Sequence, residues 1–457
     1  MSGDLTSLLS IINTQTSILQ SAYAKSNTPF PSIDDSSFNP ASSIEMDPQL
    51  ARTRQLIVAA ASQLIASVQP PAEIVQDAAL AFVKTSALGF LVDINVPEAL
   101  KGGNPEGMHV DELGKATGVD PSYIARALRY LSTRHIFTEV SPNVFKHNRN
   151  SLLATKSKSL AEVKKDPLRA FEKAPLAAFV GLLADEGMKS GCHLSPHLQN
   201  PRAPSPFSLM SGTNTKRYWD ILKEPGNEFR DQRFIAMMDG QTEAHPEEIV
   251  ISGINGNALA QNGVVVELGG NVGTATFRLK KTYPHLKYVV QDLKTGIDAA
   301  EVYWKERDAG AVTSGQVSLQ VHNFFDPQPV KNAAVYFLHS VLHDWDDPQA
   351  RKMLSNIRGA AGSNSKLVIF DMLTRYSIKG SKDTDEHSLQ VPDPLLANLG
   401  IAMPTAMDMS LLMLLGGKGR TRDDFEKLAR EAGWKLESVK VDPTVIFSMA
   451  TLTFSAA

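Results

Sequence analysis

The chain has 457 residues, of which 42% are hydrophobic and 21% are charged, which is the composition of an ordinary globular protein with two domains or more. Its net charge of −3 gives no electrostatic indication that the chain binds nucleic acids or anionic membranes.

Cysteine usage and apolar runs bear on the compartment of the protein. The single cysteine, Cys192, excludes an internal disulfide and is typical of a reducing compartment. No apolar run reaches the roughly 18 residues of a membrane span, and the N-terminus lacks the basic and apolar regions of a signal peptide. We therefore expect a cytoplasmic protein with neither a membrane nor a nucleic acid as partner.

The N-terminal part of the chain predicts apolar helices. Residues Asp4 to Tyr23 form an amphipathic helix, whose apolar stripe must be buried against a partner subunit or against its own chain. Residues Ala24 to Asp47 predict an irregular linker. Pro48 to Val68 and Ala72 to Leu91 are two further helices, separated by two prolines. The second is apolar on more than one face, which favours a place in a subunit interface.

The next segment predicts a winged helix. Met108 to Leu131 has the pattern of a helix-turn-helix, with a turn at Gly118 and a second helix that begins at Asp120-Pro121. Ile136 to His147 then predicts two strands that turn at Pro142-Asn143.

A winged helix binds DNA in some proteins and joins subunits in others. Arg126, Arg129 and Arg134 are the residues that would contact DNA, but Glu139 and the acidic balance of the chain favour dimerisation. Helices with irregular breaks follow from Ser159 to about Gly240. Ordinary core packing explains most of their large side chains.

Beyond Gly263 strands alternate with helices, which predicts a doubly wound α/β sheet. The strands are expected near 264–267, 287–291, 317–321, 333–338 and 366–370. Two strand-like segments close the chain, Trp434 to Val441 and Thr444 to Phe454.

The stretch from Val264 to Thr274 is the centre of this domain. A buried strand leads into three glycines and a helix, so the backbone can turn tightly against a ligand. Leu268 stands where the dinucleotide fingerprint needs its first glycine, which argues against NAD. Asp292 ends the next strand at a distance that suits a carboxylate gripping two ribose hydroxyls. We expect a nucleoside-bearing cofactor at the carboxyl ends of these strands.

A second informative stretch, Tyr336 to Pro348, begins in a buried strand and continues beyond the carboxyl end of that strand. His339 and His343 are four residues apart, but neither a glutamate beside the first histidine nor a third ligand supports a metal site. A neutral imidazole at a strand end can take the proton of a phenol, and His343 is the candidate base. Asp371 ends the neighbouring strand and is the natural carboxylate to orient that ring.

Five stretches in this order resemble the plant and fungal small-molecule O-methyltransferases that use S-adenosylmethionine: Val-Glu-Leu-Gly-Gly-Asn-Val-Gly, Gln-Asp-Leu, His-Asn-Phe-Phe, Leu-His-Asp-Trp-Asp-Asp and Gly-Gly-Lys-Gly-Arg-Thr. The resemblance implies a Rossmann-like catalytic domain behind a winged-helix dimerisation domain, no metal, and a homodimer. It also implies His343 as general base and Asp371 as its orienting carboxylate. The residues implied to bind the cofactor are Glu267, Gly269, Gly270, Gly273, Asp292, Leu293, Asn323, Phe324 and His339. The candidate walls of the substrate pocket are Trp219, Met237, Met238, Met403 and Met407.

Three positions depart from the family pattern. Asn323 stands where Asp is usual, His339 where Arg or Lys is common, and Gly419 where Glu is common. The glutamate is the second carboxylate beside the histidine, so its loss removes electrostatic support for a protonated base. Some fungal relatives keep the cofactor but catalyse pericyclic rearrangements.

These observations leave three hypotheses. The first is an O-methyltransferase that acts on a phenolic or enolic hydroxyl of a small aromatic or polyketide-type metabolite. The others are a pericyclase that retains the cofactor and a winged-helix regulator. The expected domains are an N-terminal helix and linker (1–47), a winged-helix dimerisation domain (48–160), a helical pocket region (161–240) and the catalytic domain (241–457).

Overall fold

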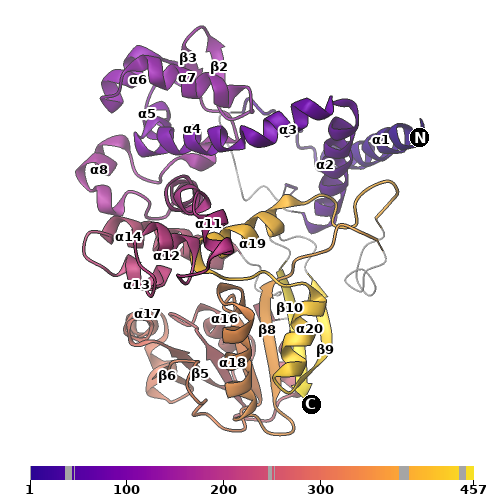
Figure 1. The fold of residues 1–457 in the computed structure, drawn as a ribbon, viewed down its shortest axis with the longest axis vertical. Helices are drawn as coiled ribbons and strands as arrows, with labels where there is room; N and C mark the ends of the chain where they lie inside the picture. The colour runs from indigo at the N-terminus through magenta and orange to yellow at the C-terminus, as the bar shows by residue number, and fades with distance from the viewer. Residues whose placement is uncertain are drawn as a thin grey trace. The chain divides into compact units, whose positions relative to one another are not determined.

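The computed structural model describes residues 2–35, 44–45, 47–244, 250–251, 253–379, 391–441 and 449–457. The chain forms two compact units, Met1–Ala244 and His245–Ala457, whose elements are labelled in Figure 1. The first unit is mainly helical, and the second contains a mostly parallel sheet with helices. This confirms the predicted α/β class.

The N-terminal helix α1 (Ser2–Lys25) packs along α2 (Pro48–Val68). Leu8, Leu19 and Tyr23 are buried between α1 and the rest of the unit. Leu5, Leu9 and Ile18 are exposed on the same helix. The helix therefore buries one apolar stripe against its own chain and leaves other apolar side chains uncovered.

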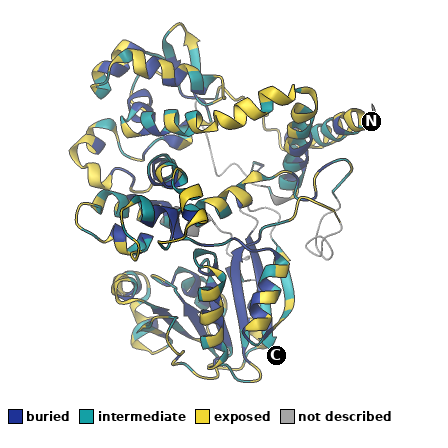
Figure 2. Cartoon of the chain, viewed as in Figure 1, coloured by how far each residue is buried: buried dark blue, intermediate teal, exposed yellow. Residues whose placement is uncertain are grey.

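The predicted helix from Ala72 to Leu91 is broken in two at Leu80, giving α3 (Pro71–Ala79) and α4 (Ala81–Asp93). Taken together, Pro71–Asp93 is long and apolar enough to cross a membrane by length and composition alone. No unbroken apolar run marks this stretch in the sequence, because it is apolar only on average. Most of the stretch is exposed in the single chain (Figure 2), including Val75, Leu80 and Phe82.

The winged helix is present as predicted. After α5 (Val96–Lys101) and the short strand β1 (Met108–His109) come α6 (Val110–Thr117), α7 (Pro121–Ser132), β2 (Thr138–Ser141) and β3 (Val144–Lys146). Gly118 makes the turn with a φ of 80°, and the Asp120 side chain caps α7 by accepting from the backbone N–H of Ser122. The wing is a three-stranded sheet in the order β1-β3-β2.

Two of the three arginines considered for DNA binding are paired with acidic side chains. The Nε atom of Arg129 lies 3.9 Å from a Glu139 oxygen, and Arg134 forms an ion pair with Asp77 of α3. These pairings reduce the positive charge that a phosphate backbone would meet.

Further helices complete the first unit. The longest of them is α14 (Glu228–Ala244), which contains residue 240, the predicted end of the helical pocket region. Arg233 of α14 donates to Asp185 and Glu186 of the π-helix Leu183–Gly187. The other segments are η1 (Ser151–Ala154), α8 (Leu160–Lys165), η2 (Pro167–Arg169), α9 (Pro175–Leu182), α10 (Met188–Gly191), α11 (Leu194–Gln199), α12 (Pro206–Met210) and α13 (Tyr218–Leu222).

The second unit is built on a seven-stranded sheet in the order β6-β5-β4-β7-β8-β10-β9. The first five strands in that order are parallel, whereas β10 is antiparallel to both β8 and β9. The strands are β4 (Val264–Leu268), β5 (Lys287–Asp292), β6 (Val317–Val321), β7 (Val335–His339), β8 (Lys366–Met372), β9 (Trp434–Val441) and β10 (Met449–Ala456). The helices are η4 (Gly256–Ala258), α16 (Thr274–Thr282), α17 (Lys294–Thr313), η5 (Leu342–Asp344), α18 (Asp347–Arg358), α19 (Ala402–Leu415) and α20 (Arg422–Glu431). Part of the last predicted strand, residues 444–448, lies outside the described residues.

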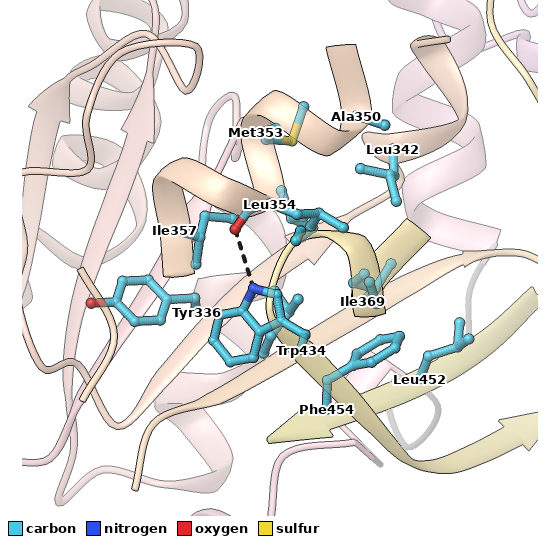
Figure 3. Packing of buried hydrophobic residues seen from close by; sticks show 14 of the residues in the cluster. Tyr336, Leu342, Ala350, Met353, Leu354, Ile357, Ile369, Trp434, Leu452 and Phe454 are labelled. Carbon is cyan, nitrogen blue, oxygen red and sulfur yellow. Dashed lines mark hydrogen bonds between the residues drawn. The ribbon is translucent and has the colours of Figure 1, made fainter. Parts of the chain in front are cut away.

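One hydrophobic cluster packs α18 and α20 against the sheet, and Figure 3 shows part of it. The Trp434 indole N–H donates to the carbonyl of Leu354 at 3.1 Å, so its one polar atom is satisfied. Leu342, which immediately precedes His343, is fully buried in this cluster. The core therefore anchors the backbone next to the candidate catalytic histidine.

Candidate active site

The carboxyl ends of β4 and β7 meet where the strand order reverses, which is where sheets of this kind bind ligands. The segments that follow these strands come close together. A Cβ atom on Gly269 would lie 3.0 Å from Val341 Cγ2 and 3.4 Å from the ring of Phe324. The glycine loop, the loop after β6 and the turn that carries His343 therefore border one site.

The glycine loop requires glycine for two physical reasons. Gly269 and Gly273 have φ angles of 65° and 81°, which other residues rarely adopt. A Cβ atom on Gly273 would lie 3.0 Å from Trp304 Nε1. The Trp304 indole also donates to the carbonyl of Val272 at 2.9 Å, so it supports the loop from α17. Sequence reasoning missed Trp304, whose one signal is a large aromatic side chain in a mostly polar helix.

Glu267 lies buried in β4, below the loop. Its Oε2 atom accepts hydrogen bonds from the backbone N–H of Thr276 at 3.1 Å and from the Thr276 hydroxyl at 2.5 Å. Burial raises the pKa of Glu267 to about 7, although these hydrogen bonds lower it. A Cβ atom on Gly270 would lie 2.9 Å from the Glu267 carboxyl carbon. The carboxyl therefore joins β4 to α16 directly beneath Gly270.

Asp292 lies at the end of β5, and each of its carboxylate oxygens accepts a hydrogen bond from the backbone. Oδ2 accepts from the backbone N–H of Asn271 and Oδ1 from that of Leu293, both at 2.7 Å. Burial raises its pKa, against these two hydrogen bonds. Each oxygen keeps lone pairs for a further donor, as a carboxylate that holds two ribose hydroxyls requires.

The other predicted cofactor contacts lie on neighbouring strand ends. The side-chain oxygen of Asn323 accepts from the backbone N–H of Phe325 at 3.0 Å, which orders the turn after β6. Leu293 is exposed beside Asp292. His339 ends β7, and its ring stacks on that of Phe370 at 4.9 Å between centroids.

The structure brings His343 and Asp371 together, as expected from adjacent strand ends. Nδ1 of His343 lies 2.5 Å from Oδ1 of Asp371, which is fully buried at the end of β8. Oδ2 of Asp371 accepts from the backbone N–H groups of Leu342 and His343 at 3.0 and 3.2 Å, and Oδ1 also accepts from Met372 at 2.7 Å. One carboxylate thus fixes both the ring and the turn that carries it.

A second carboxylate, not assigned from the sequence, faces the other ring nitrogen. Oδ1 of Asp344 lies 3.4 Å from Nε2 of His343, and the two side chains are 20% and 19% exposed. Burial by itself lowers the pKa of His343, but Asp371 and Asp344 outweigh it and raise that pKa to about 9. Burial raises the pKa of Asp344 to about 6, although His343 lowers it. The pKa of Asp371 stays below its usual value because His343 and the hydrogen bonds outweigh burial.

Comparison with known proteins shows the family of this chain. The O-methyltransferase domain family matches residues 226–435. The chain is 32% identical over 453 residues to an O-methyltransferase of Armillaria gallica, with 96% of each chain covered. The chain belongs to the S-adenosylmethionine-dependent O-methyltransferases.

Solved structures share the fold of this methyltransferase. One is an O-methyltransferase from neocarzinostatin biosynthesis in complex with S-adenosylmethionine and 2-hydroxy-5-methyl naphthoic acid. It has a TM-score of 0.60 and 20% identity, and covers 82% of this chain and 96% of its own. Another is described as a pericyclic reaction enzyme, with a TM-score of 0.65 and 18% identity, covering 98% of this chain and all of its own.

The residues of the methyltransferase fit S-adenosylmethionine. A Cβ atom at Gly269, Gly270 or Gly273 would lie 3.0 Å or less from a neighbouring side chain, so only glycine fits and the backbone of the loop stays bare. Asp292 keeps lone pairs on both carboxylate oxygens for a ribose. Phe324 lies beside Gly269 as an apolar surface for a base. Among the described residues, no group of three or more His, Cys, Asp or Glu side chains is arranged to hold a metal ion.

The space beside Gly419 is filled by another carboxylate. Oδ1 of Asp408, on α19, accepts from the backbone N–H of Gly419 at 2.6 Å. A Cβ atom on Gly419 would lie 2.9 Å from Thr374 Oγ1 and 3.0 Å from Asp408 Cγ. The usual glutamate would therefore crowd Asp408, and the methyltransferase has carboxylates near this loop despite the glycine.

A buried arginine that sequence reasoning missed holds the histidine turn. Arg420 donates to the carbonyls of Leu342 and Trp345, each at 2.8 Å, and its Nη2 atom lies 3.0 Å from Asp347. The neighbouring Lys418 backbone N–H donates to the carbonyl of His343 at 2.9 Å. Gly417 is required here because a Cβ atom would lie 2.2 Å from that carbonyl oxygen. The stretch after α19 thus fixes the backbone on both sides of His343.

The candidate pocket residues lie in both compact units. In the first unit Trp219 packs edge-on against Phe234, and Met237 is buried in α14 beside the partly buried Met238. In the second unit Met403 and Met407 are partly buried on α19. Their assignment to an acceptor pocket stays a prediction.

Proposed function

We propose that the enzyme methylates a phenolic or enolic hydroxyl of a small aromatic or polyketide-type metabolite. The observation that carries this proposal is the His343 ring, held between two carboxylates at the edge of the sheet where the glycine loop lies. The structural relative bound to a hydroxy-naphthoic acid supports an aromatic acceptor.

In this proposal the glycine loop and Asp292 hold the cofactor, with Phe324 beside its base. When bound, S-adenosylmethionine supplies a methyl group on a positively charged sulfur, which becomes a neutral thioether on transfer. The protein then has to align the acceptor oxygen with that carbon and remove its proton, and alignment alone supplies much of the rate.

His343 is the catalytic residue at the acceptor oxygen. The sequence predicts it as a general base, and in its protonated form the same ring would donate a hydrogen bond to the acceptor oxyanion. Asp371 orients the ring in either case, because it is buried and bonded to both the ring and the turn.

A pericyclase that retains the cofactor is the second candidate, and Gly419 is the observation that favours it. The carboxylates of Asp408 and Asp344 reduce the weight of that observation, since the region keeps negative charge without the usual glutamate. The pericyclic enzyme among the structural relatives shares less than a fifth of its sequence with this chain, so the likeness concerns the fold.

We also propose a homodimer joined through the first unit. Val75 on α3, Leu80 between α3 and α4, and Phe82 on α4 are each more than half exposed. Ile65 and Val68 are exposed at the end of α2. Apolar side chains that gather in this way mark an interface, and a second copy of the chain would cover them.

Incubation with methyl-labelled S-adenosylmethionine and a panel of phenols tests the proposed function. We expect label to appear on at least one acceptor and to fall by roughly 10²–10⁴-fold in His343→Ala, with cofactor affinity unchanged by calorimetry. Cofactor binding without label transfer to any phenol would contradict methylation and favour the pericyclase. Failure to bind the cofactor would contradict both.

A further inference from the structure

We propose that Asp408 is a positioning residue, through which helix α19 holds the turn that carries His343. This inference rests on the proposed methyl transfer and adds to it a residue that acts on the base rather than on the acceptor. The path from Asp408 to the histidine runs through the backbone of two loop residues, Lys418 and Gly419.

The path begins with a short hydrogen bond from the loop to the helix. Oδ1 of Asp408 accepts from the backbone N–H of Gly419 at 2.6 Å. A hydrogen bond to a carboxylate is about twice as strong as one between neutral groups. The two residues also fit closely, because a Cβ atom on Gly419 would lie 3.0 Å from both Cβ and Cγ of Asp408. A side chain at position 419 would therefore push the loop away from the helix.

The bond to Asp408 is not needed to end α19. The helix closes at Gly416, whose φ is 71°. The backbone N–H groups of Gly416 and Gly417 donate to carbonyls of the last helical turns at 3.1 and 3.2 Å. Asp408 reaches beyond this closure to a residue further along the chain, so its bond serves the loop rather than the helix.

Gly419 lies between two residues that bind carbonyls of the histidine turn. Before it, the Lys418 N–H donates to the carbonyl of His343 at 2.9 Å. After it, the Arg420 guanidinium donates to two further carbonyls of the same turn, each at 2.8 Å. Asp408 therefore holds the loop at the centre of its contact with the turn.

The residues on either side of this bond are anchored to different degrees. The carbonyl of Arg420 accepts from the Thr374 N–H just beyond β8 at 2.9 Å, and its guanidinium pairs with Asp347 at 3.0 Å. The Lys418 ammonium also pairs with Asp347, but both side chains are more than a third exposed, so solvent screens the pair. Asp408 therefore acts mainly on Lys418, whose N–H is bonded to the histidine carbonyl.

The turn sets where the imidazole of His343 lies. Asp371 holds the ring and two N–H groups of the turn, and the loop holds the carbonyls. A backbone bonded through both its donors and its acceptors has less freedom than one bonded on a single side. A displacement of about 1 Å in an active site can lower a rate by about 10²-fold. Asp408 thus contributes to the rate by keeping the base in place.

Two substitutions separate the hydrogen bond of Asp408 from its charge. Asp408→Ala removes both, whereas Asp408→Asn removes the charge and keeps a side-chain oxygen for the Gly419 N–H. We expect Asp408→Ala to lower kcat roughly 10- to 100-fold on an acceptor that the wild type methylates, with KM and the cofactor Kd within about threefold of wild type. Asp408→Asn should recover most of that loss, to within about fivefold of wild type.

Asp120→Ala is the matched control. Oδ1 of Asp120 also accepts from a backbone N–H, that of Ser122 at 2.8 Å, but it caps α7 in the first unit. Its loss should destabilise the protein and leave kcat within about twofold of wild type. Urea unfolding of both alanine variants measures the loss of stability, so that a loss of position can be told from a loss of folded protein.

Several kinetic outcomes would overturn the proposal. An equal loss in Asp408→Asn and Asp408→Ala would mean that the carboxylate acts by its charge. A raised KM with unchanged kcat would place Asp408 against the acceptor, since the predicted pocket wall Met407 is its neighbour on α19. A wild-type kcat in Asp408→Ala would mean that the turn does not depend on the helix. Absence of label transfer by the wild type would instead contradict the methyltransferase function.

Hydrogen exchange tests the same contacts without turnover. In Asp408→Ala we expect the backbone N–H of Lys418, which is bonded to the carbonyl of His343, to exchange roughly 10- to 100-fold faster than in wild type. In Asp408→Asn its exchange should stay within about threefold of wild type. Equal exchange of this N–H in wild type and Asp408→Ala would overturn the proposal, whatever reaction the enzyme catalyses.

Discussion

Replacing Asp371 by Asn should destabilise the protein by an amount that depends on pH. Asp371 is fully buried and accepts hydrogen bonds from three backbone N–H groups and from His343. In the variant the amide NH₂ must face either two of these backbone N–H groups, or one of them together with the ring. At least one buried donor loses its acceptor, which costs about 1–3 kcal/mol at any pH.

The pH-dependent part comes from His343. Its pKa in the folded protein is about 9, above the ordinary value of about 6.5 in the unfolded chain. Protonation of His343 therefore stabilises the folded protein fully below pH 6.5, and this contribution is lost as pH rises through 9. Returning that pKa to its ordinary value would remove up to roughly 3 kcal/mol at pH 6 and nothing at pH 10. The Asp371 carboxyl titrates well below this window and contributes a constant amount.

Urea unfolding of wild type and Asp371→Asn at pH 6 and pH 9.5 measures this pH-dependent contribution to the free energy of unfolding. The free-energy gap between the two proteins should be larger at pH 6 than at pH 9.5. A gap that is the same at both pH values would refute the reasoning, because His343 would then gain no proton affinity from its buried partner.

Three further predictions concern other parts of the molecule. Asp292→Ala should weaken S-adenosylmethionine by roughly 1.5–3 kcal/mol in calorimetry, and NAD should not bind to wild type; tight NAD binding would contradict the reading of the glycine loop. Gly419→Glu should lower the free energy of unfolding by about 1–3 kcal/mol in urea, because the new Cβ atom would clash with Thr374 and the new carboxylate would lie near that of Asp408. A more active or more stable variant would contradict the close contact between residue 419 and Asp408. Val75→Asp should shift the mass seen by light scattering from dimer toward monomer, and an unchanged dimer would place the interface elsewhere.

Local sequence signals were sufficient for most elements of the fold. The helix-turn-helix carried a capping aspartate and a turn glycine, and the structure shows both in those roles. The pairing of His343 with Asp371 was also predictable, since neighbouring parallel strands end at the same edge of a sheet. The break at Leu80 was not predictable, because neither glycine nor proline marks it.

The rest of the site depends on the local geometry of a short turn and on contacts between distant segments. Asp344 reaches Nε2 only because a short 3-10 turn follows β7, and Arg420 reaches that turn from a segment that follows α19. Asp408 fills the space at Gly419 by a hydrogen bond from helix to loop. No spacing in the sequence indicates such approaches, so these contacts could not be predicted from the family pattern.

The place of β10 in the sheet sets an order on the assembly of the active site during synthesis. β10 follows all other strands in the chain, yet it pairs with β8, with Ala450 opposite Asp371. The strands that carry the glycine loop, Asp292 and His343 precede it and have their own parallel neighbours. On the ribosome the cofactor half of the sheet can therefore form early, while the apolar β8 keeps an open edge until β10 emerges. That interval is when the nascent chain is most exposed to wrong strand pairing.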